Sequence, residues 1–259
     1  MWLRDLIYRL YQRRLENAVR DGSLPRHVGV VLDGNRRFAK KLGLFGVGAG
    51  HQAGADKAED FISWCDSLGV PIVTVWALSV DNFKRDPEEL ESIFAIVEEK
   101  IDGLADAQRR TGRKRRVRAV GRLELLPEST RAAISRVETE TATNGPYELI
   151  VAVGYGGREE ITDAVRRMIA ARLQSGESLE GIAASLEPDE IGRYMYAPDV
   201  PDPDLIIRTS GELRFSGFLL WQSAYSEYYF CDVFWPEFRK IDFLRAIRSY
   251  AQRQRRRGA

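Results

Sequence analysis

The fold is decided by residues 27–38, HVGVVLDGNRRF, in which an apolar run ends at an aspartate and a glycine. The run His27–Leu32 is continuous rather than alternating, which is typical of a strand buried on both faces of a parallel sheet. The residues after it open a helix. Five further runs rich in valine, isoleucine and aromatic residues predict the other strands: Val70–Leu78, Val117–Gly121, Tyr147–Gly154, Asp204–Arg208 and Glu227–Val233.

Helical patterns fill the gaps between these runs. In Gln52–Leu68 and Pro87–Ala107 apolar residues recur every three to four positions, which favours amphipathic helices. Further helices are predicted at Pro127–Thr143, Arg158–Leu173, Ser178–Leu186 and Ile241–Arg255. Strands that alternate with helices form βαβ units, so we expect an α/β fold: a single domain with an about six-stranded, largely parallel sheet covered by helices on both faces.

We place this domain at residues 27–259, after an N-terminal helix within residues 1–26. The N-terminus MWLRDLIYRLYQRRLENAVR is not a signal peptide, because charged residues interrupt every apolar stretch. Its apolar residues recur at helical spacing: Leu3, Leu6, Ile7, Leu10, Tyr11 and Leu15. Such a helix packs against the body of the protein or a partner, or it lies on a membrane surface.

The composition excludes several classes of protein. Basic and acidic residues number 39 and 38, and the net charge of +1 argues against a nucleic-acid binder held by bulk charge. Cys65 and Cys231 are far apart and form no CxxC pair, so we interpret them as small buried hydrophobes. No apolar run is long enough to span a membrane. We therefore expect a reducing, cytoplasmic setting.

Charge is concentrated locally in two places. Residues 109–118, RRTGRKRRVR, carry seven basic side chains, and the chain ends in RQRRRGA. The first cluster is predicted to be a solvated face, with contact to anionic membrane lipid as the weaker interpretation.

Ligands in open α/β sheets bind outside the carboxyl ends of the strands, so the residues after each strand indicate the site. Asp33-Gly34-Asn35-Arg36-Arg37-Phe38 follows the first strand and opens a helix, whose N-terminus presents free N–H groups to an anion. A carboxylate there repels a phosphate unless a metal ion bridges them. Asp33 is therefore a candidate magnesium ligand, and the alternative is that it only caps a tight turn.

The second and fifth strands are followed by similar segments. Ser79-Val80-Asp81-Asn82-Phe83-Lys84-Arg85 offers short polar groups and two cations, or an Asx-type turn into the next helix. Residues 208–217, RTSGELRFSG, hold two arginines, three hydroxyls and two glycines, which suit phosphate oxygens and a close backbone. Glu227, at the start of the last strand, is a second carboxylate that we expect to complete a metal site with Asp33.

His51 opens a helix within Gly48-Ala49-Gly50-His51-Gln52-Ala53, which fits the pattern G-x-G-x-x-A. A dinucleotide site also requires a preceding strand and an acidic residue about 20 positions on, and the sequence offers neither. His51 is interpreted as a phosphate contact or a general acid or base, with a helix-capping role as the alternative.

Together the strand tips predict a site that holds phosphate groups with arginines and one divalent ion. Its arginines exceed what one phosphate needs, which indicates two anionic groups or two diphosphates. They are Arg36, Arg37, Arg85, Arg208 and Arg214.

Five ordered blocks cover the chain from about His27 to the C-terminus: HVGVVLDGNRRFAKKLG, GHQAGADK, ALSVDNFKRDPEEL, VAVGYGGREEI and DLIIRTSGELRFSGFLLWQSAYSEYYFCDVFWPEF. With the terminal RRRG they resemble the cis-prenyltransferases, also called Z-isoprenyl or undecaprenyl diphosphate synthases, and look like the actinobacterial members. The resemblance implies a Mg²⁺-dependent condensation of isopentenyl diphosphate with an allylic diphosphate, geranyl or farnesyl diphosphate. The implied product is a Z-polyprenyl or Z,E-farnesyl diphosphate.

The resemblance also implies roles for individual residues. Asp33 holds magnesium and the allylic diphosphate, Asn82 helps to remove the proton, and Glu227 is the second magnesium ligand. The implied substrate contacts are Gly34, Asn35, Arg36, Arg37, Phe38, His51, Ser79, Asp81, Phe83, Arg85, Arg208, Arg214 and Ser216. Arg256 and Gly258 match an R-x-G tail that reaches the neighbouring subunit's site, which implies a homodimer.

Product length is left open between C15 and C50-type chains. The resemblance implies an apolar tunnel walled by the helices Gln52–Leu68 and Pro87–Ala107. Ala77 is small and leaves room in it, whereas Trp76, Phe94 and Ile101 are candidates to close it. Similarity to short-chain actinobacterial members favours C15.

Two other functions remain as alternatives. One is a non-catalytic partner subunit with this fold, and the other is a nucleotide-binding oxidoreductase that uses residues 48–53. No nucleic-acid partner is expected for the prenyltransferase. The expected location is cytoplasmic, with peripheral contact at the inner face of the plasma membrane.

Overall fold

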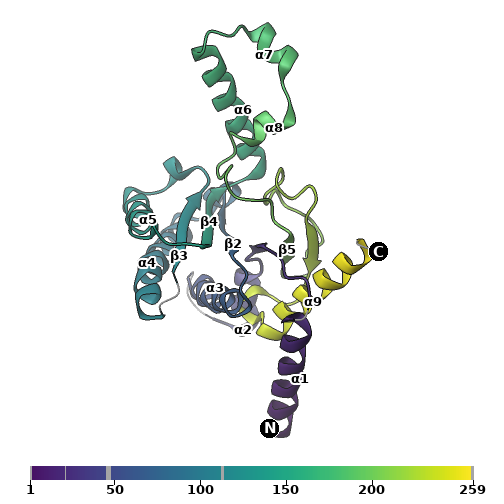
Figure 1. Cartoon of the computed structure of the whole chain (residues 1–259). Coiled ribbons are helices and arrows are strands. Elements are labelled where there is room, and N and C mark those ends of the chain that lie inside the picture. The colour runs from purple at the N-terminus through teal and green to yellow at the C-terminus, as the bar shows by residue number, and fades with distance from the viewer. Residues whose placement is uncertain (1, 21, 45–47, 112–113, 258–259) are drawn as a thin grey trace.

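Six strands of the described chain form one sheet in the order β3-β4-β2-β1-β5-β6, and all neighbouring pairs are parallel. The computed structural model (Figure 1) describes residues 2–20, 22–44, 48–111 and 114–257, without the side chains of 2–6, 105–111 and 254–257. The strands are β1 (His27–Val31), β2 (Ile72–Ser79), β3 (Arg115–Val120), β4 (Tyr147–Tyr155), β5 (Leu205–Arg208) and β6 (Glu227–Phe230). The predicted α/β fold with a parallel sheet is confirmed.

The predicted helices are present, and one short helix is added. The helices are α1 (Trp2–Arg20), α2 (Asn35–Leu42), α3 (Ala49–Leu68), α4 (Pro87–Thr111), α5 (Glu128–Thr141), α6 (Gly157–Gln174), α7 (Leu179–Ser185), α8 (Pro188–Gly192) and α9 (Lys240–Arg257). Single 3₁₀ turns lie at η1 (Val80–Lys84), η2 (Leu123–Leu125) and η3 (Trp235–Glu237). The bounds of α2 and the existence of α8 were not predicted. β6 ends before the predicted Val233, because the loop after β5 bonds to Cys231 and Val233 instead.

The two faces of the sheet are covered differently. On one face α3, η3 and α9 meet in an aromatic cluster, in which the Phe61 ring lies 5.7 Å from that of Trp235 and 5.1 Å from that of Phe243. On the other face Trp76 stacks on Phe218 at 5.2 Å. Phe218 belongs to a non-helical segment between α8 and β6. The predicted sheet flanked by helices is confirmed, and this irregular aromatic segment packs on the second face as well.

α1 packs on the body of the protein through its second half. Leu15 and Val19 are buried, and Glu16 pairs with Lys240 of α9 at 2.7 Å. Figure 1 shows the first half of α1 extending away from the sheet. None of the helices, over their described residues, is long and apolar enough to cross a bilayer.

Three titratable side chains outside the predicted site are buried or half-buried. Cys65 is free and buried, and burial raises the pKa of its thiol. Cys231 is also free and half-buried. His27 lies between Thr74 and the carbonyl of Pro201, at 2.7 Å from each, and burial lowers its pKa to about 4. These residues belong to the core and to the amino edge of the sheet.

The basic cluster at residues 109–118 is not a uniform solvated face. Arg115 is 3% exposed, pairs with Asp66 at 2.6 Å and donates to the carbonyls of Val70, Pro71 and Glu148. Arg118 pairs with Glu148 and, at 2.7 Å, with Asp199. Arg115 thus ties the end of α3 to the amino edge of the sheet. The positions within 109–113 lie outside the described side chains.

Arg115→Met is expected to destabilise the protein by about 3–5 kcal/mol, because it leaves Asp66 and three carbonyls without their buried donor. Urea unfolding followed by circular dichroism measures this change. Lys114→Met removes an exposed cation of the same cluster, and it is expected to change stability by less than about 0.5 kcal/mol. Equal stabilities of the two variants would contradict the structural role of Arg115.

Candidate active site

The order of the strands brings three loops together at one edge of the sheet. β2, β1 and β5 are neighbours, so the segments that follow their carboxyl ends converge. Near its end β2 is out of register with β4, which leaves Ala77 without a partner between Trp76 and Leu78. Such a bulge changes the direction of side chains beside a site. The site predicted from the strand tips is therefore assembled at the carboxyl ends of these strands.

A sharp turn after β1 places Asp33 at the centre of this edge. Gly34 follows with a φ of 105°, and a Cβ there would lie 2.9 Å from the ring of Phe234. Only glycine fits this left-handed, closely packed position. The Asp33 carbonyl accepts the N–H of Trp235 and the hydroxyl of Thr209. The backbone of the turn is thus fixed, and α2 begins directly after it.

Glycines let α3 pack closely against α2 and α4. A Cβ on Gly50 would lie 2.4 Å from the Asn35 carbonyl oxygen, and one on Gly54 would lie 2.4 Å from Asn35 Oδ1. A Cβ on Gly48 would lie 2.2 Å from the Ser92 hydroxyl of α4. The glycines of residues 48–53 therefore serve helix packing, and α2 rather than a strand precedes them. This disagrees with the dinucleotide-binding alternative.

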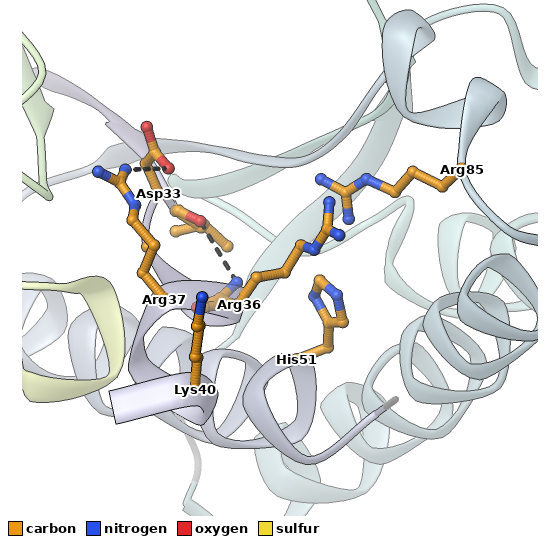
Figure 2. Close-up of a pocket in the computed structure, with 9 residues that line it drawn as sticks. Asp33, Arg36, Arg37, Lys40, His51 and Arg85 are labelled. Atoms are coloured by element: carbon orange, nitrogen blue, oxygen red, sulfur yellow. Dashed lines mark hydrogen bonds and ion pairs between the residues drawn. The ribbon is translucent and has the colours of Figure 1, made fainter. Parts of the chain in front are cut away.

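A cavity of about 570 Å³ opens beside the N-terminus of α2. Figure 2 shows the basic side chains that surround it, with Arg36 and Arg85 directed toward each other above His51. The lining comprises Leu32, Asp33, Gly34, Asn35, Arg36, Arg37, Lys40, His51 and Arg85. Cationic side chains and free helix N–H groups in one cavity form an anion site.

Glu89, in the first turn of α4, organises the basic side chains on one side of this cavity. Its Oε1 accepts from Arg85 at 2.9 Å, lies 3.0 Å from His51 Nε2 and lies 3.6 Å from Arg36. Burial lowers the pKa of His51, the arginines lower it further, and the hydrogen bond with Glu89 opposes them. The net effect is that the pKa of His51 lies below its usual value, which favours the neutral imidazole.

A second cavity, of about 240 Å³, adjoins the first and shares Asp33, Asn35, His51 and Arg85 with it. Arg208, only 4% exposed, lines this cavity and donates to Asp33 Oδ2 at 3.1 Å, to the Ser216 hydroxyl at 2.7 Å and to the Arg214 carbonyl. Among the described residues its Nε is buried without a partner. This cavity therefore has donor capacity for a second anion.

The polar residues after β2 line the same second cavity. Ser79 and Asn82 form a reciprocal pair in which Asn82 Oδ1 accepts the N–H of Ser79 at 3.0 Å and the Ser79 hydroxyl accepts the N–H of Asn82. Arg37 bridges the two neighbouring loops, because it contacts Asp33 at 3.2 Å and donates to Ser210 at 2.6 Å. Residues from all three loops thus line one cavity, and Arg37 joins two of these loops.

Five predicted site residues do not line either cavity. Asp81 is exposed and pairs with Lys84, and Arg214 is exposed and pairs with Glu212. Phe38 is half-buried on α2, and Phe83 packs against Phe94 at 6.1 Å between ring centres. Glu227 is treated separately below. The side chain of Arg256 and the whole of Gly258 lie outside the described residues.

Glu227 is not brought to Asp33. It pairs in register with Leu205, three residues before Arg208, so it lies about 10 Å along the strand from the carboxyl edge. Its carboxylate accepts from Arg253 of α9 at 2.7 Å. The expectation of a joint metal site is therefore wrong for the single chain, because Glu227 opens its strand whereas Asp33 follows one.

The donor set at the carboxyl edge fits magnesium only together with a ligand. The described side chains contain no cluster of three or more metal-binding His, Cys, Asp and Glu residues. Magnesium is commonly held by one or two carboxylates plus substrate phosphates. Asp33, 29% exposed between the two cavities, is such a carboxylate.

Two residues of the site were not predicted from the sequence. Lys40 lines the first cavity. Its position one helical turn after Arg36 could have indicated this, because residues four apart lie on the same face of a helix. No sequence pattern indicated that Glu89 belongs to the site, because its role depends on how closely α4 approaches α2 and α3. A buried carboxylate among three basic side chains is visible only in the folded chain.

An apolar cavity of about 90 Å³ lies behind the polar site. It shares Leu32 with both polar cavities and Ala77 with the second. Its walls come from α3, α4, β2 and β4, including Ala55, Ile62 and Val97. Phosphate-binding groups and an apolar chamber are therefore adjacent.

Arg36→Met is expected to weaken the binding of inorganic diphosphate by at least about ten-fold, because a charge-assisted contact contributes about 1.5–3 kcal/mol. Isothermal titration calorimetry measures the affinity. Lys84→Met removes a cation that is 82% exposed and pairs with Asp81 outside the cavities, so its affinity is expected to match the wild type. Unchanged binding by Arg36→Met would contradict an anion site in the first cavity.

Comparison with known proteins agrees with this geometry. Residues 31–258 match a family model described as "Putative undecaprenyl diphosphate synthase". The chain is 53% identical to a (2Z,6E)-farnesyl diphosphate synthase from Thermobifida fusca over 99% of this chain and 98% of that protein. It is also 53% identical to a tritrans,polycis-undecaprenyl-diphosphate synthase (geranylgeranyl-diphosphate specific) from Methanopyrus kandleri, over 97% and 91% of the two chains.

A solved structure of a similar protein has the same fold as this chain. Lavandulyl diphosphate synthase from Lavandula x intermedia, in complex with dimethylallyl diphosphate, superposes with a TM-score of 0.82 at 34% identity, over 88% of this chain and 95% of that one. Family match, full-length relatives and fold all agree. The chain therefore belongs to the cis-prenyltransferase, or undecaprenyl diphosphate synthase, family of isoprenyl transferases.

Proposed function

We propose that this isoprenyl transferase condenses isopentenyl diphosphate with an allylic diphosphate in two adjacent anion cavities. The observation that carries the proposal is that these cavities adjoin an apolar chamber, with which they share the lining residues Leu32 and Ala77. A prenyl diphosphate has a strongly anionic head and an apolar tail. Its head fits the basic cavities and its tail fits the chamber.

The first cavity is assigned to the allylic diphosphate. Arg36, Arg37 and Lys40 project from α2, whose N-terminal N–H groups face the same space. As the allylic carbon–oxygen bond breaks, the departing diphosphate gains negative charge. Cations already in place then stabilise the transition state more than the ground state.

The second cavity is assigned to isopentenyl diphosphate. Arg208 and Ser216 line it from the β5 side, and Asn82 lines it from the β2 side. The bond between Asn82 Oδ1 and the Ser79 N–H fixes the Asn82 side chain where it would help to remove the proton of the isopentenyl group. Two separate anion cavities explain why the site has more arginines than one phosphate group requires.

Magnesium is proposed as the cofactor, held by Asp33 together with the allylic diphosphate. The ion would supply positive charge to the leaving group. In the chain itself Asp33 is held by Arg37 and Arg208, at 3.2 and 3.1 Å. These two arginines orient its carboxylate toward the boundary of the two cavities.

A short-chain, C15-type product is proposed. Sequence similarity does not discriminate, because the farnesyl and undecaprenyl diphosphate synthases quoted above are each 53% identical to this chain. The apolar chamber of about 90 Å³ favours a short tail. It is smaller than the cavity of about 150 Å³ that accepts one benzene molecule in another protein.

A homodimer of this chain is proposed, with its C-terminal tail contributing to the neighbouring site. The discriminating alternative is a non-catalytic subunit that needs a different partner. Asp33, Asn82 and Arg208, one from the end of each of three neighbouring strands, line the same cavity, which supports catalysis by this chain alone. Turnover by the purified chain without any other protein separates the two functions.

Asp33→Asn is expected to reduce magnesium-dependent turnover by at least about 10³-fold, because it removes the charge that attracts the metal while preserving the side-chain shape. Incorporation of labelled isopentenyl diphosphate with a geranyl diphosphate primer measures turnover. Asp60→Asn, at an exposed position of α3, should keep wild-type activity. Near-normal turnover of Asp33→Asn, with an unchanged melting temperature, would refute the metal role.

Peripheral contact with an anionic membrane is proposed for the surface formed by α1 and α9. α1 carries five arginines against two acids, and α9 carries seven basic residues against one acid. The pair therefore has a formal charge of +9 in a chain whose total is +1. Ile7 and Leu10 of α1 are 59% and 56% exposed on this surface. Basic charge beside exposed apolar side chains suits an anionic bilayer interface.

Ile7→Ser with Leu10→Ser is expected to lower binding to vesicles of phosphatidylglycerol and phosphatidylcholine several-fold, because two exposed apolar side chains no longer enter the interface. Co-sedimentation measures the bound fraction. The control is Leu179→Ser, equally exposed on α7 at the opposite end of the molecule in Figure 1. Loss of binding in both variants, or in neither, would contradict docking through α1.

A further inference from the structure

The wall of the apolar chamber contains one pair of charged residues. Its lining is aliphatic or alanine except for Glu59 of α3 and Lys100 of α4. Lys100 Nζ lies 2.5 Å from Asp56 Oδ1 and 3.0 Å from Glu59 Oε1. The Lys100 side chain is only 20% exposed, although both acids are more than half exposed. The ion pairs therefore connect the two helices across the outer wall of the chamber.

α3 and α4 are connected at two points. Near the polar site His51 of α3 contacts Glu89 of α4 at 3.0 Å, and further along the same helices Lys100 contacts Asp56 and Glu59. Ala55 and Ala58 of α3, between and beside these points, line the chamber together with larger residues of α4. Small side chains permit close approach of two helices, so the chamber stays narrow while both connections hold.

The size of the chamber makes this connection relevant to the hydrocarbon. About 90 Å³ is less than the 150 Å³ or so that accommodates six-carbon benzene in another protein. The chamber therefore holds only part of a prenyl tail. Separation of α4 from α3 is the movement that would enlarge it, because both helices form its wall.

We propose that Lys100 determines product length, because its ion pairs with Asp56 and Glu59 hold α4 against α3 and oppose elongation. The proposal rests on the proposed function, since it concerns the hydrocarbon of that reaction. Each elongation step has to stretch these ion pairs, which raises its free energy. Release of the product does not stretch them and is therefore not slowed. The balance between release and elongation then sets the length.

The geometry makes these ion pairs more effective than ordinary surface pairs. An isolated exposed pair contributes about 0.2–1 kcal/mol. Lys100 has two partners, and its methylene stem lies in the apolar wall. Burial lowers the pKa of Lys100, but the two carboxylates outweigh it and the pKa lies above its usual value. The side chain therefore stays charged throughout the neutral range.

Lys100→Met tests the proposal, because methionine keeps the apolar stem and removes both ion pairs. Products formed from geranyl diphosphate, labelled isopentenyl diphosphate and Mg²⁺ are separated by chain length. The ratio of longer products to the main wild-type product is expected to rise about five-fold, which corresponds to about 1 kcal/mol. The control Lys57→Met removes a lysine that is also 20% exposed but pairs within α3, with Asp60 at 2.7 Å. Its products should match the wild type.

The double variant Asp56→Asn, Glu59→Gln removes the same ion pairs from the other side. Its products should lengthen to the same extent, and combining it with Lys100→Met should add nothing, because the interaction is already lost. It also serves as the test if Lys100→Met does not fold. Arg136→Met breaks the exposed contact of α4 with α5 at Asp102, and it should leave product length unchanged.

The outcomes separate this proposal from the proposed function. A wild-type chain that consumes no isopentenyl diphosphate with any allylic primer contradicts the proposed function itself. An active wild type whose product length is unchanged in both Lys100→Met and Asp56→Asn, Glu59→Gln overturns the role of Lys100 alone. Equal lengthening in Lys57→Met or Arg136→Met also overturns it, because general loosening of the helices would then explain the effect.

Discussion

The contact between Arg208 and Asp33 is the interaction on which the rest of the site depends. Arg208 is almost fully buried at the carboxyl end of β5, and a buried guanidinium needs a partner. Asp33 provides it from the neighbouring strand β1, at 3.1 Å. This contact fixes the loop after β5 against the loop after β1. It also places Asp33 at the boundary of two cavities, where a single carboxylate serves both.

The same edge concentrates positive charge that the chain compensates locally. Glu89 lies among Arg36, His51 and Arg85, and Glu212 lies between Arg37 and Arg214. These carboxylates limit repulsion among the cations in the free protein, while the Arg208 Nε keeps unused donor capacity. An anionic ligand adds further counter-charge. The near-zero net charge of the sequence is therefore compatible with a strongly basic site, because the compensation occurs within a few ångströms.

The second polar cavity and the apolar chamber adjoin each other at the end of β2. The bulge around Ala77 places this small residue in the lining of both the second polar cavity and the apolar chamber. On the other face of the sheet Trp76 stacks on Phe218. The strand side of the chamber is therefore packed from behind, whereas its helix side is closed by α3 and α4, which Lys100 connects.

Much of this arrangement was predictable from the sequence, because it depends on local patterns. Continuous apolar runs gave the strands, helical spacing gave α3 and α4, and the residues after the strands gave Asp33, Asn82 and Arg208. Prediction failed where it depended on which edge of the sheet a residue lies at, or on whether its side chain is buried. Glu227 opens its strand and therefore lies at the amino edge, against Arg253. Arg115 was grouped with a surface cluster, although its side chain enters the protein toward Asp66.

The sequence by itself determined the α/β class, the loops that carry the chemistry and the types of residue in them. Only the tertiary structure decided which side chains share a cavity, that Glu89 organises the basic residues, and that Lys100 connects α4 to α3. The physical reason is that periodicity and turns are set by neighbours in the chain. Ion pairs such as Lys100–Asp56 join residues far apart in sequence, so they exist only once burial of the strands has fixed the order of the sheet and the approach of its helices.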